Sequence, residues 1–246
     1  MAVRRQAPAG EAGGRRPAMT APAVRGPSRP PPFAPPGPAR KALMVALGAN
    51  AVMAWVVILG VYTFLDRVWR GLGAGVAAGS LEAHWSQLET ARRLQGLAWV
   101  VTAVLFLVWL HRVYGNLGVL GAHRMRFSPR WAVGTFFVPV LNLVWPFLVL
   151  REVWNASGAD ADDAPLPTST PPLVAAWWAT FVTATVLDPG FRRLVEDPAS
   201  RLAVGGPTLL LFVAQLAEIA AAVLAIVLVL RIDERQGRRL ATLEAG

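Results

Sequence analysis

The sequence predicts an all-α protein that crosses a bilayer several times as a polytopic bundle of transmembrane helices. Two observations lead to this fold class. Apolar residues make up 54% of the chain and charged residues only 16%, against roughly 25% charged residues in globular domains. The apolar residues gather in five runs, at 43–65, 97–114, 131–150, 173–187 and 207–230. Cysteine is absent, which separately excludes disulfides, thiolate metal sites and cysteine nucleophiles.

The first 41 residues are predicted to form a disordered cytoplasmic tail. They contain ten of the twenty prolines, and eight basic residues against the single acid Glu11. A segment with so few large apolar side chains cannot bury enough surface to offset its conformational entropy. A transmembrane helical domain is expected at 42–232 and a short cytoplasmic tail at 233–246.

Four of the five runs predict membrane spans. Run 43–65 contains one notable polar side chain, Asn50, and as a helix would be about 34 Å long, enough for a hydrocarbon core of about 30 Å. Run 97–114 ends in the aromatic and basic side chains typical of a membrane interface. Run 173–187 is short, whereas run 207–230 is long and begins with a proline, which suits the first turn of a helix.

The run at 131–150 is interrupted by Pro139 and Pro146, so that it is predicted either to re-enter the membrane or to form a fifth membrane segment. Each proline lacks an N–H and disrupts the helical bond to the carbonyl four residues before it. Broken backbone at membrane depth must face protein or a wet cavity. Asn142, four residues before Pro146, is positioned to satisfy some of the freed groups. An ordinary kinked transmembrane helix is the alternative.

Orientation follows from the excess of Arg and Lys on the cytoplasmic side. Four spans with both termini inside place seventeen basic residues on the inner side and seven on the outer side, whereas five spans place fifteen and nine. The four-span topology is therefore favoured. Because 23 of the 24 basic residues are Arg, and Ala, Gly and Pro are abundant, we expect a bacterial protein of the cytoplasmic (inner) membrane.

A distinctive set of residues surrounds the proline-broken run. This motif segment comprises Asn116, Arg124, Pro129, Trp131, Gly134, Pro139, Asn142, Pro146, Glu152 and Trp154. It resembles a bacterial family of presumed integral membrane proteins known as domain of unknown function 4328, over roughly residues 45–235. The chain departs from that pattern at Thr135, Trp145 and Leu148, which makes the run more apolar and favours spanning. The resemblance implies a helical membrane fold and no particular chemistry.

Glu218, at the middle of run 207–230, is the centre of a candidate intramembrane polar site with Gln215, Asn50 and Asn142. On a helical wheel Glu218 shares a face with Gln215 and several alanines, which predicts that its carboxyl points into the bundle. One interpretation is a proton- or cation-binding group, for which Thr102 is a further candidate partner. The other is a neutral carboxyl that holds helices together by hydrogen bonds. No second buried charge accompanies Glu218 in the sequence pattern, which favours the structural role.

The loop from 112 to 130 carries basic residues and no acid. We expect it to contact anionic lipid head groups, each basic residue contributing about 1 kcal/mol near the surface, or to serve only in setting the topology. Glu152 and Trp154 follow the broken run; they are predicted to anchor its end, with lining of a site as the alternative. The head-group candidates are Arg112, Arg124, Arg126 and Arg130.

No known catalytic pattern is present, because the chain has no HExxH pair, GxSxG elbow, P-loop or dinucleotide-binding fingerprint. We therefore expect neither an enzyme nor a cofactor. The charge of +9 is distributed as membrane topology requires, so no nucleic-acid partner is expected. The predicted function is a non-enzymatic membrane module that assembles with itself or with another membrane protein. The alternative is a small transporter or channel with a polar path near Glu218 and segment 131–150.

Overall fold

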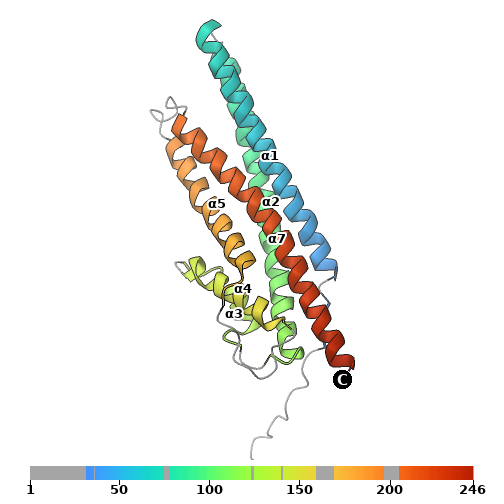
Figure 1. The fold of residues 1–246 in the computed structure, drawn as a ribbon. Coiled ribbons are helices and arrows are strands. Elements are labelled where there is room, and N and C mark those ends of the chain that lie inside the picture. Colours follow the sequence, from blue (N-terminus) through green and yellow to red (C-terminus); the bar gives the residue numbers. More distant parts are fainter. Residues whose placement is uncertain are drawn as a thin grey trace, which may run out of the picture. The chain divides into compact units, whose positions relative to one another are not determined.

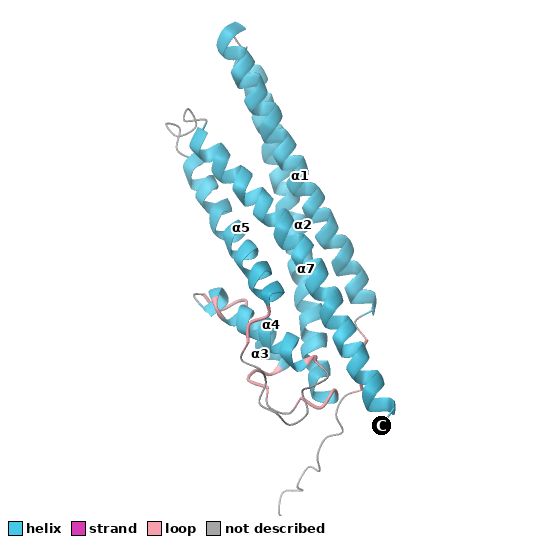
Figure 2. Cartoon of the chain, viewed as in Figure 1, coloured by secondary structure: helices cyan, strands magenta, loops and turns pink. Residues whose placement is uncertain are grey.

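A computed structural model describes residues 32–35, 37–74, 78–122, 125–139, 141–158, 169–196 and 205–245, with side chains omitted at 72–74, 78–82, 189–196 and 205–207. Within these ranges the chain is all-helical and has no strand (Figure 2). The elements are α1 (Gly37–Ala74), α2 (Ala78–Val119), α3 (Pro129–Gly134), the 3₁₀ helix η1 (Leu141–Leu143), α4 (Trp145–Ala156), α5 (Pro172–Glu196) and α7 (Gly205–Ala245). The predicted fold class is confirmed at the level of an all-helical protein with membrane-length helices.

Three helices are long and apolar enough to cross a bilayer. They contain the stretches Gly37–Gly71, Ala83–Val119 and Thr208–Ala245. The predicted spans 43–65, 97–114 and 207–230 lie within the helices α1, α2 and α7. α5 has a shorter apolar stretch, Pro172–Asp188, which at 1.5 Å per residue measures about 26 Å against a hydrocarbon core of about 30 Å.

The long helices run alternately in opposite directions (Figure 1). α7 packs against both α1 and α5, and α1 packs against α2. The start of α1 and the last turns of α2 and α7 meet at one end, where Asp233 accepts a hydrogen bond of 3.1 Å from Trp109 Nε1 and lies 3.6 Å from Arg40. We call this the basic end, because exposed basic side chains gather there: Lys41, Arg112, Arg126, Arg130, Arg231 and Arg238.

The proline-broken run does not form a single kinked helix. It forms the short α-helices α3 and α4, with the 3₁₀ helix η1 between them. α3 ends at Gly134, the chain turns before η1, and α4 begins at Trp145. Pro146 occupies the first turn of α4, where its missing N–H leaves no helical bond unmade. α4 has 12 residues, about 18 Å of helix, too short to span. In Figure 1 both helices lie toward the end of the bundle at which α5 begins.

The predicted domain boundaries fall inside helices. α1 begins at Gly37, ahead of the expected boundary at residue 41, and α7 continues unbroken past residue 232 to Ala245. Most of the predicted disordered tail, residues 1–31, lies outside the described residues. The largest group of buried apolar residues joins α1, α2, α4, α5 and α7 and includes Trp109, Leu117, Leu150, Val174 and Ile232.

Candidate functional site

The buried carboxyl of Glu152 holds α4 against the end of α2. Glu152 is 7% exposed. Its Oε2 accepts a hydrogen bond of 2.8 Å from the Tyr114 hydroxyl, and its Oε1 accepts one of 2.6 Å from the backbone N–H of Arg126. The backbone N–H of Phe127 donates in turn to the Tyr114 hydroxyl at 3.0 Å. Both carboxylate oxygens are therefore used in contacts between elements.

Asn116, near the end of α2, connects the segment before α1 to α7. Its amide makes two hydrogen bonds of 3.0 Å with the backbone of Ala34, donating to the carbonyl and accepting from the N–H. The same amide lies 3.4 Å from Gln236 Oε1 on α7. Gln236 Nε2 donates to Val113 O at 3.0 Å and to Ser157 Oγ at 3.3 Å, so that α2, α4 and α7 meet through one amide.

Two arginines of α7 complete this group. Arg239 is 3% exposed and donates to the backbone carbonyls of Leu120 at 2.7 Å and Gly158 at 3.2 Å, which follow the last residues of α2 and α4. A cation placed at a helix C-terminus interacts favourably with the helix dipole. One turn earlier, the guanidinium of Arg235 lies 4.9 Å from the centre of the Trp154 ring, in cation–π contact. We call the whole group the basic-end cluster: Tyr114, Asn116, Glu152, Trp154, Ser157, Arg235, Gln236 and Arg239.

The other motif residues have different positions. Ser128 and Pro129 start α3, with Ser128 Oγ accepting from the N–H of Trp131 at 3.3 Å, and Gly134 ends it. Pro139 and Asn142 are exposed, and the Asn142 side chain makes no hydrogen bond to any residue that the structure describes. Arg124 lies outside the described residues. The buried polar residues of the motif segment therefore make contacts between helices.

A second polar group lies deeper along the helices. Gln95 Nε2, on α2, donates to Gln215 Oε1 at 2.7 Å and to Glu218 Oε2 at 2.8 Å, both on α7. Arg92 Nη2 forms an ion pair of 2.6 Å with Asp188 Oδ1 of α5. Gln95 and Gln215 are 6% and 1% exposed. We call these five residues the inner cluster.

The inner cluster differs from the polar site predicted around Glu218. The structure brings Glu218 and Gln215 together through Gln95. Asn50 instead donates to the Thr102 hydroxyl and to the carbonyl of Ala98, in a separate contact between α1 and α2. Asn142 has no part in either contact.

Sequence reasoning missed the α2 and α5 members of the inner cluster. The Arg92 and Asp188 side chains are only 11% and 30% exposed. Glu218 is therefore accompanied by one pair of oppositely charged side chains, which the sequence pattern did not indicate. Arg92 and Gln95 precede the apolar run at 97–114. They were therefore not considered as members of an intramembrane polar site. Their spacing of three residues, which places both on one helix face, is the signal that would have found them.

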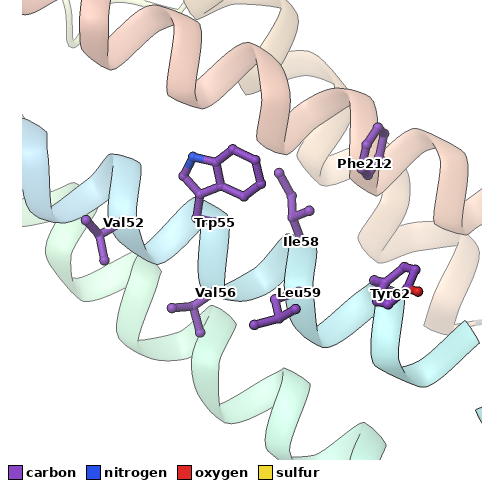
Figure 3. Close-up of a pocket in the computed structure, with 7 residues that line it drawn as sticks. All are labelled: Val52, Trp55, Val56, Ile58, Leu59, Tyr62 and Phe212. Carbon is purple, nitrogen blue, oxygen red and sulfur yellow. The ribbon is translucent and has the colours of Figure 1, made fainter. Parts of the chain in front are cut away.

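The outer face of α1 carries a shallow apolar groove, shown in Figure 3. Six of its residues belong to α1 and one, Phe212, belongs to α7. Trp55 and Tyr62 are 59% and 66% exposed. The lining residues are Val52, Trp55, Val56, Ile58, Leu59, Tyr62 and Phe212.

At the basic end, exposed apolar and basic side chains lie close together in the chain. Trp131 and Phe137 are 57% and 71% exposed, and the neighbouring Arg126 and Arg130 are exposed as well. Arg112, the remaining described head-group candidate, is also exposed, near the end of α2. This combination is typical of a surface at the membrane–water interface.

Comparison with known proteins identifies a family but no activity. Searches among curated proteins and among solved structures find no match. The family described as Domain of unknown function (DUF4328) matches residues 74–234, which extend from the end of α1 into the last turns of α7 and contain the inner cluster and most of the basic-end cluster. Because this match covers more than half of the chain, the protein belongs to the DUF4328 family.

Proposed function

We propose that the protein is a non-enzymatic assembly module of the bacterial cytoplasmic membrane, with four spans and both termini in the cytoplasm. The directions of the helices support this topology. α2 ends and α5 begins toward the same end of the bundle, so α3 and α4 join them without a crossing (Figure 1). That end carries six exposed basic residues, against Arg67, Arg70 and Arg93 elsewhere in the described chain, and the positive-inside rule places such an excess on the cytoplasmic side.

The observation that carries the assembly proposal is Trp55 in the α1 groove (Figure 3). Trp55 lies near the middle of the apolar run 43–65, whereas tryptophan is enriched at membrane interfaces. Its side chain is exposed, and its indole N–H donates to no described residue. Lipid chains offer no acceptor, but a neighbouring protein does. The exposed side chains of Val45, Val52 and Leu59 recur every seven residues on this helix, in a stripe suited to a second copy of the chain.

Cysteine cross-linking in native membranes tests this interface, because the chain has no cysteine of its own. We expect Val52→Cys and Leu59→Cys to form disulfide-linked dimers under mild oxidation. Val104→Cys is the matched control, since Val104 is similarly exposed (55%) but lies on α2. Equal cross-linking at all three positions, or none at 52 and 59, would contradict self-assembly through α1.

Topology reporters fused after Asp163 and after Pro198 test the four spans. We expect the first fusion to report a cytoplasmic position and the second a position on the outer side. An external position for residue 163 would exclude the proposed topology.

Anionic lipids are the second proposed partner. Arg112, Arg126 and Arg130 are available to head groups, each with about 1 kcal/mol of electrostatic attraction near an anionic surface. We expect the double substitution Arg126→Gln, Arg130→Gln to reduce the phosphatidylglycerol retained on the purified protein. Arg93→Gln is the control, because Arg93 is exposed on α2 more than a dozen residues from the basic end. Equal loss in both variants would contradict a specific contact at the basic end.

A second candidate function is a small transporter or channel, favoured by the charged residues of the inner cluster. Proteoliposomes loaded with a pH-sensitive dye test it, with wild type compared against Glu218→Gln. Flux that Glu218→Gln abolishes would support transport. The absence of proton or cation flux under any imposed gradient would exclude it.

A further inference from the structure

Glu218 is isolated in a long apolar stretch. It is the sole titratable residue between Pro207 and Arg231. Fifteen residues separate it from Asp233 at the basic end, about 22 Å along α7. The carboxyl therefore lies within the depth of a bilayer core of about 30 Å if α7 spans the membrane. An ionised carboxylate at that depth requires a compensating charge.

The direct partners of Glu218 supply no such charge. Its Oε2 accepts a hydrogen bond from the neutral amide of Gln95, which Gln215 holds from the other side. Its Oε1 bonds to none of the residues described, and the described part of the chain gives the carboxyl no ion pair. One oxygen is thus fixed in position and the other is free to carry a proton.

Among the side chains that the structure describes, two charged groups that act on Glu218 come from α2 and α5. Arg92 of α2 and Asp188 of α5 lie within electrostatic range of its carboxyl. Arg92 is bonded directly to Asp188, so its charge is shared with another carboxylate. α1 contributes no titratable group at this depth, because residues 42–61 contain none. Asp188 favours the protonated form of Glu218 and Arg92 favours the ionised form, so these two charges act in opposite directions.

The donors at the cluster indicate which ligand it takes. A metal cation needs several converging oxygen ligands. Here Gln95 directs its NH₂ group toward the carboxylate, and a guanidinium stands nearby. A proton needs only the one free oxygen. We propose that the inner cluster is a proton-binding site, in which Glu218 accepts a proton from water on Oε1 while Gln95 and Gln215 hold the carboxyl in place. This site depends on neither the assembly interface nor net transport.

Infrared spectroscopy of the full-length protein in lipid nanodiscs tests the proposal, with pH as the variable. We expect a carbonyl-stretch band of a protonated carboxyl that disappears reversibly as the pH rises. Glu218→Gln removes this band. Glu89→Gln, which changes a carboxyl on α2 with an exposed side chain (52%), leaves the band in place. A band that persists in Glu218→Gln would overturn the assignment, as would a wild-type protein with no pH-dependent carboxyl band.

Two further variants predict shifts of opposite sign. Asp188→Asn removes a like charge, so the pH midpoint of the band should fall, by about one unit; Arg92→Gln removes an opposite charge, so the midpoint should rise by about as much. Both leave the Glu218 carboxyl intact, so they remain informative if Glu218→Gln does not fold. Identical midpoints in wild type and both variants would overturn the role of the cluster. A midpoint that changes when sodium replaces choline at constant ionic strength would show a metal-cation site and refute the proton site.

Discussion

The basic-end cluster and the inner cluster each contain one glutamate together with amide and arginine side chains, but the two glutamate carboxyls are bonded differently. Both oxygens of Glu152 accept hydrogen bonds, from the Tyr114 hydroxyl and from a backbone N–H. One oxygen of Glu218 accepts a bond, from the Gln95 side chain. Two bonded oxygens hold the Glu152 carboxyl between elements and support a packing role. The free oxygen of Glu218 leaves room for a proton and supports the proposed binding role.

The largest effect should come from breaking the basic-end cluster at Glu152. Glu152→Leu leaves the Arg126 N–H without its acceptor. It also leaves the Tyr114 hydroxyl only the Phe127 carbonyl, at 2.9 Å, so we expect the free energy of unfolding to fall by about 3 kcal/mol. Unfolding in detergent micelles measures the change. Glu152→Gln keeps one acceptor oxygen and should be milder. A loss below about 1 kcal/mol for Glu152→Leu would contradict the packing role.

A smaller loss is expected at Arg239. Arg239→Leu removes the donors to the Leu120 and Gly158 carbonyls, at an expected cost of about 2 kcal/mol. The neighbouring Arg238 has a side chain that is 70% exposed, so Arg238→Leu should change stability by less than about 0.5 kcal/mol. The same unfolding assay compares the two. Equal losses would show that the buried guanidinium has no special role.

The contact between Arg235 and Trp154 should contribute less to the free energy of unfolding than Arg239 does. Trp154→Leu removes the cation–π contact, whose energy is about 0.5–1 kcal/mol at a partly exposed site. A double-mutant cycle with Arg235→Gln isolates this term from the change in packing. A coupling energy of zero would show that the ring acts through packing alone.

The smallest effect on stability is expected at Glu218. Glu218→Leu removes one hydrogen-bond acceptor of Gln95, whose amide keeps its bond to Gln215, so we expect the free energy of unfolding to fall by no more than about 0.5–1 kcal/mol. The comparison between the clusters requires Glu152→Leu to be much more damaging in the same assay. Similar losses at the two glutamates would remove the distinction between packing and binding.

The sequence predicts the long helices well because their formation depends on local composition. Runs 43–65, 97–114 and 207–230 are long enough and apolar enough to form membrane-length helices whatever their neighbours. The break at Pro139 and Pro146 was also predictable, because proline acts locally. That the chain then turns back into α4 was not, because the turn accompanies a contact between Tyr114 and Glu152, which are 38 residues apart.

The candidate site was predictable only in part. Glu218 stands out because it is a lone acid in an apolar run, and Gln215 shares its face by helical periodicity. Gln95, Arg92 and Asp188 come from α2 and α5, and their approach to Glu218 is set by how the helices pack. Hydropathy places all three at or beyond the edges of apolar runs, where it gives no information on depth within the bundle.

The unbroken length of α7 links the two clusters mechanically. The helix carries Glu218 and Arg239 on one rod, 21 residues apart, which is about 32 Å. The carbonyls that Arg239 contacts hold the last turns of α7, so a tilt of the helix about this end would move Glu218. A tilt of about 5° would displace Glu218 by about 3 Å over this length. That movement is comparable to the hydrogen-bond length between Gln95 and Glu218, so even a slight rocking of the rod would be enough to engage or release the carboxyl.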